Sequence, residues 1–184
     1  MLINNFKYKN LKRVLIRKMK KILHIDSSPR ISLDSISKQL SQKIVNILSE
    51  KYDVEVIYKD LHKEKIPFID NDWVNVAYKK TPRTDKEKKV LECFEVQSFI
   101  DADFMVMGSP MYDFNIPSIL KNYIEHLYIS GITLDYKYKS LVNPKKIYIA
   151  SSAGWNYKGK EVEKDFEGMF RKAFEFLRLK DIFF

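Results

Sequence analysis

The feature that most constrains the fold is the regular alternation of short apolar runs with longer segments of helical periodicity. The apolar runs have the length and composition of short strands and lie at residues 21–26, 54–58, 104–107, 146–150 and 182–184. The segments between them that space their apolar residues like helices are 35–48, 85–100, 117–129 and 161–178. Such alternation is typical of right-handed βαβ units. The sequence therefore predicts an α/β fold, a doubly wound five-stranded parallel sheet with helices on both faces. Because the chain ends at Phe184, we expect the last strand and its following helix to be truncated.

The same patterns predict local details. The first helix is expected to begin near Ser35 and to have an apolar face made of Ile36, Leu40, Ile44, Ile47 and Leu48. Residues 60–85 are expected to form a long connection that contains Pro67 and Pro82. The single cysteine, Cys93, lies on the second predicted helix, and a buried thiol is its default environment.

The positive charge of the chain is concentrated at its N-terminus. The formal net charge is +9, but residues 1–21 hold eight Lys or Arg and no acid, which leaves 25 basic against 24 acidic residues in the rest. We therefore divide the chain into a basic extension, residues 1–19, and one domain, residues 20–184. The nearly neutral domain lacks the basic surface expected of a nucleic-acid binder.

Several other classes are excluded by the sequence. The five glycines are too far apart for a GxGxxG or Walker A loop, and the three histidines lack metal-ligand spacing, so no metal is expected. No apolar run approaches the roughly 18 residues of a membrane span, and the N-terminus has no secretory signal pattern. We expect a cytoplasmic protein without a membrane partner.

Three loops follow the predicted strands at the edge where ligands bind in such sheets. The first carries the hydroxyls of Ser28, Ser35 and Ser37 and leads into a helix N-terminus, which favours an anion. Ordinary helix capping by Ser35 or Asp34 is the alternative. The second, residues 108–123, supplies flat apolar side chains, and the third, residues 151–155, supplies small ones. Together they predict a phosphate cradle beside a flat apolar slot, which suits a mononucleotide such as FMN.

The second loop carries a more specific similarity. Residues 110–118, Pro-Met-Tyr-Asp-Phe-Asn-Ile-Pro-Ser, and 120–123, Leu-Lys-Asn-Tyr, resemble a motif of FMN-dependent NADH-azoreductases. These enzymes belong to the NAD(P)H:quinone oxidoreductase branch of flavodoxin-like proteins. The resemblance implies a homodimer that binds FMN, takes hydride from NADH or NADPH, and reduces quinones or azo compounds. No catalytic side chain is expected, because the flavin carries the chemistry.

The resemblance also implies which residues contact the cofactor. For the phosphate these are Ser28, Ser35, Ile36 and Ser37. Along the flavin ring they are Pro110, Met111, Tyr112, Asp113 and Phe114, and on its other polar edge Ser151, Ser152, Ala153 and Gly154.

Two departures from the family are visible. Asp113 stands where azoreductases commonly have Asn, and an ionised carboxylate cannot donate a hydrogen bond. The segment 131–141 is shorter and poorer in glycine than the family's loop. A flavodoxin-type electron carrier and an inactive flavodoxin-like binding protein remain the alternatives, and reduction of a quinone by NAD(P)H would distinguish them.

Overall fold

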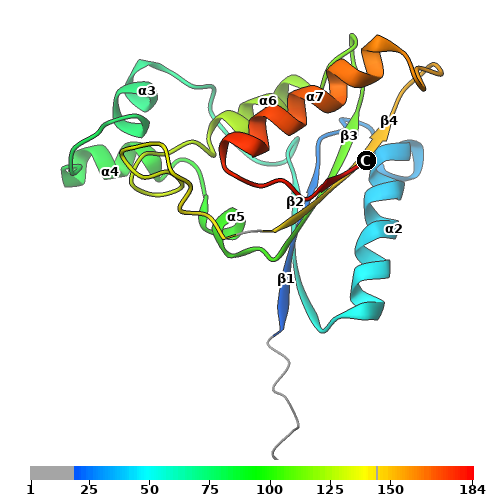
Figure 1. The fold of residues 1–184 in the computed structure, drawn as a ribbon, viewed down its shortest axis with the longest axis horizontal. Helices are drawn as coiled ribbons and strands as arrows, with labels where there is room; N and C mark the ends of the chain where they lie inside the picture. The colour runs from blue at the N-terminus through cyan, green and yellow to red at the C-terminus, as the bar shows by residue number, and fades with distance from the viewer. Residues whose placement is uncertain (1–18, 144) are drawn as a thin grey trace, which may run out of the picture.

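The computed structural model describes residues 19–143 and 145–184 (Figure 1). The expected basic extension, apart from Met19, lies outside these residues.

A single five-stranded sheet forms the centre of the molecule. Its strands are β1 (Lys20–Asp26), β2 (Val54–Asp60), β3 (Phe104–Pro110), β4 (Lys146–Ser152) and β5 (Ile182–Phe183). All neighbouring strands are parallel, in the order β2-β1-β3-β4-β5. The predicted doubly wound parallel sheet is therefore confirmed. β3 is buried along its whole length, as expected of a central strand covered on both faces.

The helices divide between the two faces of the sheet. The structure contains a short 3-10 helix η1 (Ser32–Asp34) and the α-helices α2 (Ile36–Lys51), α3 (Asn71–Ala77), α4 (Asp85–Leu91), α5 (Gln97–Asp101), α6 (Ser118–Glu125) and α7 (Glu161–Phe176). α2 covers one face, and α3 to α7 lie on the other (Figure 1). The sheet has a hydrophobic core on each face, and alternate residues of β1 contribute to one or the other. Ile22 packs with Val45 and Leu48 of α2, whereas Leu23 and Ile25 belong to the larger core. None of the helices in the described residues combines the length and apolar content needed to cross a membrane.

The expected apolar face of α2 is confirmed only in its second half, where Leu48 is buried and Ile44 packs against the same core. Ile36, Leu40 and Ile47 are exposed, and the buried residues are Ser37, Lys38, Ser41, Val45 and Leu48. The reason is the strand below the first half of the helix: β1 presents the polar side chains of His24 and Asp26 to it. Small and polar residues of α2 satisfy those groups, and only its second half meets an apolar surface.

The expected helix over residues 85–100 is two helices. The Glu95 carboxylate accepts hydrogen bonds from the backbone N–H of Ser98, at 2.7 Å, and from its hydroxyl, at 2.6 Å, and so begins α5 separately. Cys93 lies in the turn between the helices and is exposed, so the buried thiol expected there is also wrong.

The long connection after β2 contains a helix that the sequence interpretation missed. The Asp70 side chain caps α3 by accepting a 2.8 Å hydrogen bond from the Trp73 N–H. The buried residues of this helix are Trp73, Val76 and Ala77. An N-cap residue followed by apolar residues three, six and seven positions later was the available signal.

Candidate functional site

The register of the sheet brings the three loops together. Asp26, the last residue of β1, lies opposite Gly108 of β3, and Pro110 at the end of β3 lies opposite Ser152 at the end of β4. The strand order reverses at β1, so the loops after these strands border the crevice in which doubly wound sheets bind ligands.

A cleft of about 320 Å³ occupies this crevice. Residues of all three loops line it: Ser28, Arg30, Asp34, Ser35, Ile36, Pro110, Met111, Tyr112, Ser152, Ala153 and Gly154. One end of the cleft is therefore built by hydroxyls and a helix N-terminus, and the other by apolar side chains.

The polar end keeps hydrogen-bond donors available. Ser35 is the N-cap of α2, and its Oγ accepts a hydrogen bond from the Lys38 N–H at 3.4 Å. Capping uses a lone pair of the Ser35 oxygen, so the hydroxyl hydrogen can still be donated to a bound anion. Ser35 can therefore cap the helix and bind an anion at the same time. The N–H groups of Ile36 and Ser37 lie in the first turn, where a helix supplies no acceptor. Ser28 Oγ likewise accepts from the Arg30 N–H, at 3.3 Å, and keeps its hydrogen.

The apolar end is shaped by a tight turn. Tyr112 and Asn115 exchange two backbone hydrogen bonds of 2.9 Å, and the two residues between them have positive φ, +46° at Asp113 and +65° at Phe114. Both turn residues are therefore left-handed, a conformation that Asp tolerates and that costs Phe on the order of 1 kcal/mol. The Met111 N–H donates a 2.7 Å hydrogen bond to the Ser152 carbonyl, which joins this loop to the third one.

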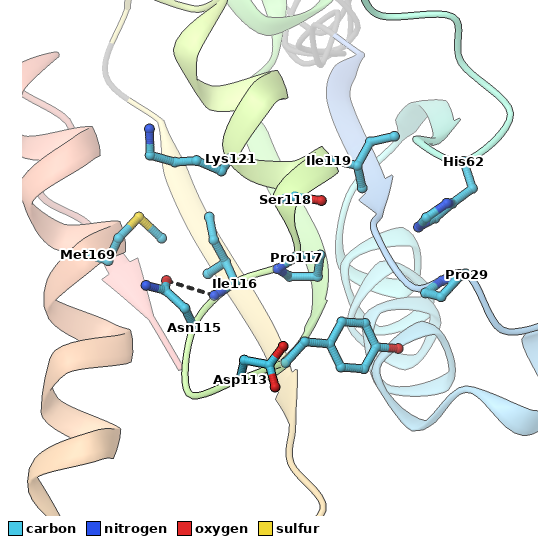
Figure 2. Close-up of a pocket in the computed structure, with 11 residues that line it drawn as sticks. Pro29, His62, Asp113, Asn115, Ile116, Pro117, Ser118, Ile119, Lys121 and Met169 are labelled. Atoms are coloured by element: carbon cyan, nitrogen blue, oxygen red, sulfur yellow. Dashed lines mark hydrogen bonds between the residues drawn. The ribbon is translucent and has the colours of Figure 1, made fainter. Parts of the chain in front are cut away.

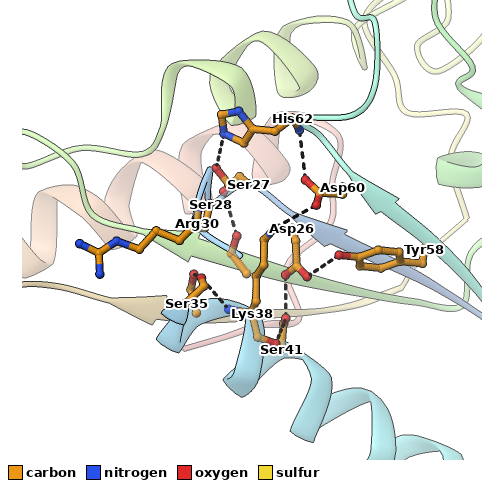
Figure 3. A network of polar contacts seen from close by, with 12 residues as sticks. Asp26, Ser27, Ser28, Arg30, Ser35, Lys38, Ser41, Tyr58, Asp60 and His62 are labelled. Atoms are coloured by element: carbon orange, nitrogen blue, oxygen red, sulfur yellow. Dashed lines mark hydrogen bonds and ion pairs between the residues drawn. The ribbon is translucent and has the colours of Figure 1, made fainter. Parts of the chain in front are cut away.

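A buried polar network supports the polar end from below (Figure 3). The Asp26 carboxylate accepts hydrogen bonds from Ser41 Oγ at 2.8 Å and from Tyr58 Oη at 3.0 Å. His24 Nε2 lies 2.9 Å from the same Ser41 oxygen. Burial, together with the charge of the Asp26 carboxylate, raises the pKa of Tyr58, so its phenol stays a donor. The network ties β1, β2 and α2 into one support for the loop that begins at Ser27.

A buried ion pair completes this support. Lys38 Nζ lies 2.9 Å from Asp60 Oδ2, and both side chains are almost fully buried. Asp60 Oδ1 accepts the His62 N–H at 3.2 Å, and a ring nitrogen of His62 lies 3.2 Å from the Ser27 carbonyl (Figure 3). The loop after β2 is thereby held against the loop after β1.

The structure places the sequence-predicted residues in three groups. Nine of them line the cleft: Ser28, Ser35, Ile36, Pro110, Met111, Tyr112, Ser152, Ala153 and Gly154. Ser37 is buried beneath it, with its Oγ 3.4 Å from that of Ser35. Ser151 lines a smaller cavity on the α7 side, Asp113 lines a different neighbouring cavity, and Phe114 is exposed beside the ring of Tyr157.

Two lining residues were missed. Arg30 and Asp34 both border the polar end of the cleft. Arg30 is the one cation between β1 and α2, and a cation in a loop expected to bind phosphate was the signal that could have found it.

A second, larger cavity (Figure 2) adjoins the cleft. Tyr112 lines both. Its volume is about 660 Å³, within the range of small-molecule sites. Its lining is partly apolar and includes Pro29, Ile116, Pro117, Ile119 and Met169, with His62, Asp113, Asn115, Ser118 and Lys121 as the polar members.

This fold and this cleft define a flavodoxin-like protein, and comparison with known families agrees. The chain belongs to the family described as flavodoxin-like fold, whose model matches residues 20–184. Among its relatives, an FMN-dependent NADH:quinone oxidoreductase 1 of Idiomarina loihiensis is 34% identical over 167 residues, covering 88% of this chain and 84% of the relative. An FMN-dependent NADH:quinone oxidoreductase of Xanthomonas oryzae is 35% identical, with 88% and 81% covered.

Solved structures show the same fold. An azoreductase from Bacillus anthracis superposes with a TM-score of 0.75 at 22% identity, covering 89% of this chain and 84% of that one. A second B. anthracis structure, an FMN-dependent NADH-azoreductase in complex with FMN, has a TM-score of 0.73 at 23% identity, with 90% and 85% covered.

Proposed function

We propose that this protein is an FMN-dependent oxidoreductase that passes hydride from NADH or NADPH to quinones or azo compounds. For a quinone, NAD(P)H, one proton and the quinone give NAD(P)⁺ and the hydroquinone. For an azo bond, two NAD(P)H and two protons give two amines. The observation that carries the proposal is the single cleft in which the loops after β1, β3 and β4 meet.

The residues of the cleft fit FMN. Its polar end offers hydroxyl and N–H donors and one guanidinium, the set of groups that binds a phosphate monoester. Its other end offers Pro110, Met111 and Tyr112 to a flat ring. When bound, FMN supplies the hydride-accepting and hydride-donating chemistry, and the protein binds and orients it.

Each wall of the cleft has a separate task. Ser28, Ser35 and the first turn of α2 hold the phosphate, and Arg30 balances part of its charge. Met111 and Tyr112 would cover a bound ring. Ala153, with only a methyl group, and Gly154, with no side chain, would leave room for the ring's polar edge beside the backbone of residues 152–154. The adjoining 660 Å³ cavity would then receive the electron acceptor.

The test is spectroscopic. Purified protein is expected to show the absorption bands of oxidised flavin, to release FMN on denaturation, and to lose those bands when NADH is added without oxygen. Adding a naphthoquinone should restore them. A protein that dithionite bleaches but NADH and NADPH do not would be an electron carrier, and a protein that releases FAD or no flavin would refute the proposal.

We also propose a homodimer. Large apolar side chains are exposed close to the cleft, and the resemblance to azoreductases implies that the cofactor lies near a subunit interface. The most exposed of them are Ile31 at 68%, Leu33 at 87%, Ile36 at 58%, Phe114 at 62% and Trp155 at 71%. Monomeric proteins rarely leave such a cluster uncovered. Light scattering during gel filtration tests the assembly, and a monomer at micromolar concentration would contradict it.

The expected cytoplasmic location also stays a proposal. It is supported by the use of NADH or NADPH, which are cytoplasmic reductants, and cell fractionation would test it.

A further inference from the structure

The polar lining of the 660 Å³ cavity carries an uneven charge. Asp113 and Lys121 are its acidic and basic side chains, and the imidazole of His62 also lines it (Figure 2). Lys121 Nζ forms an ion pair with Glu125 Oε1 one helical turn away, so its charge is already balanced on α6. Asp113 differs: among the described residues its carboxylate has no hydrogen-bond or ion-pair partner.

A backbone turn places Asp113 at the wall of the cavity. Asp113 and Phe114 form the two-residue turn closed by Tyr112 and Asn115, with both φ angles positive. The flanking residues are anchored, because the Asn115 side chain accepts a 2.8 Å hydrogen bond from the Ile116 N–H, and Ile116 and Pro117 are buried. The turn therefore fixes the Cβ of Asp113 at the wall of the cavity, although the side chain itself is exposed.

An unpaired negative charge at the wall of a binding cavity acts on charged ligands. At a partly exposed site, a unit charge about 7 Å away changes the affinity of a charged ligand about threefold to tenfold, and salt screens the interaction. An anionic ligand is disfavoured to that extent and a cationic one favoured, whereas an uncharged ligand is unaffected.

We propose that Asp113 makes this cavity select uncharged or cationic electron acceptors over anionic ones. The inference rests on the proposed function, because it takes the cavity beside the flavin cleft as the acceptor site. It assigns Asp113 a part in substrate specificity that is separate from holding the cofactor.

The test compares wild type with Asp113→Asn, which keeps the shape of the side chain and tolerates the left-handed turn. With NADH as donor, kcat/KM is measured for 1,4-naphthoquinone and for its 2-sulfonate, at about pH 8, above the ordinary titration range of histidine. The variant should lower the preference for the neutral quinone about threefold to tenfold at low salt, and less at high salt. The ratio of the two acceptors also cancels any change in the flavin itself. Asp53→Asn, which removes the same charge at the opposite edge of the sheet, should leave the ratio unchanged.

A binding measurement does not depend on turnover. Dissociation constants of naphthalene-2-sulfonate and its uncharged analogue naphthalene-2-sulfonamide are measured calorimetrically for the purified holoprotein. Asp113→Asn should tighten binding of the sulfonate by the same threefold to tenfold and leave the sulfonamide unchanged. Equal selectivity in wild type and variant, by rates and by binding, would overturn the inference while leaving the proposed function intact. Failure of NADH to reduce either quinone would refute the proposed function, and the binding constants would still decide the role of Asp113.

Discussion

Replacing Gly108 by alanine should damage both stability and cofactor binding. A Cβ at this position would lie 2.3 Å from Asp26 Oδ1 and 3.1 Å from both the Ser37 carbonyl oxygen and Ser41 Oγ. The first distance is impossible, and the Asp26 side chain is buried and held by two hydrogen bonds, so it cannot simply swing aside.

The size of the effect follows from these contacts. Displacing the carboxylate weakens its hydrogen bonds to Ser41 and Tyr58, and the added methyl overpacks the site, by about 1–3 kcal/mol for each of these two effects. We expect a total loss of about 2–6 kcal/mol in the free energy of unfolding, or on the order of 10 °C in melting temperature. Because Ser37 belongs to the first turn of α2, FMN affinity should fall as well.

The assay is urea unfolding of the apoprotein, followed by titration with FMN. Gly168→Ala is the matched control, since nothing lies within 4 Å of a Cβ there. It should stabilise α7 by about 0.5–1 kcal/mol. Asp26→Ala removes the clashing atom, so Gly108→Ala should cost less in that background. A Gly108→Ala protein as stable as wild type would refute the reasoning.

Three further predictions concern other parts of the chain. Ser35→Ala should weaken FMN binding about tenfold to a hundredfold, taking about 1.5–3 kcal/mol for a hydrogen bond to a charged phosphate. Thr84→Ala, which removes the N-cap of α4, should lower stability without changing FMN affinity. Equal FMN affinity in the two variants would mean that Ser35 is a helix cap alone. Burial lowers the pKa of Lys145 to about 8, so between about pH 8 and 10 the unfolded state binds more protons and this residue's contribution to stability rises with pH. Urea unfolding should show wild type gaining on the order of 2 kcal/mol over Lys145→Met across that range, and parallel pH profiles would contradict it. Deleting residues 1–18 should leave melting temperature and FMN content nearly unchanged, since the family model matches residues 20–184; a large loss of either would make the extension part of the folded domain.

Much of the fold could be predicted from the sequence because its signals are local. The run Phe104–Met107 is apolar on every residue, as expected of a strand covered on both faces, and the other strands were placed from short runs rich in apolar residues. The motif at residues 110–123 is a contiguous stretch, so its resemblance to azoreductases was readable without any structure. The meeting of the three loops at one edge of the sheet then followed from the general rule for doubly wound folds, whereas the order of the strands came only from the structure.

What the tertiary structure decided depends on partners far away in the sequence. The buried face of α2 is polar in its first half because Asp26 and His24 lie beneath it, and helical periodicity alone cannot show that. Asp113 sits within the motif, yet a tight turn with two left-handed residues directs it to the neighbouring cavity rather than into the cleft. The sequence by itself determined the strands, the class of fold and the chemistry of the loops. Which cavity each loop residue lines was decided by packing and backbone geometry, because those depend on neighbours that only the folded chain brings together.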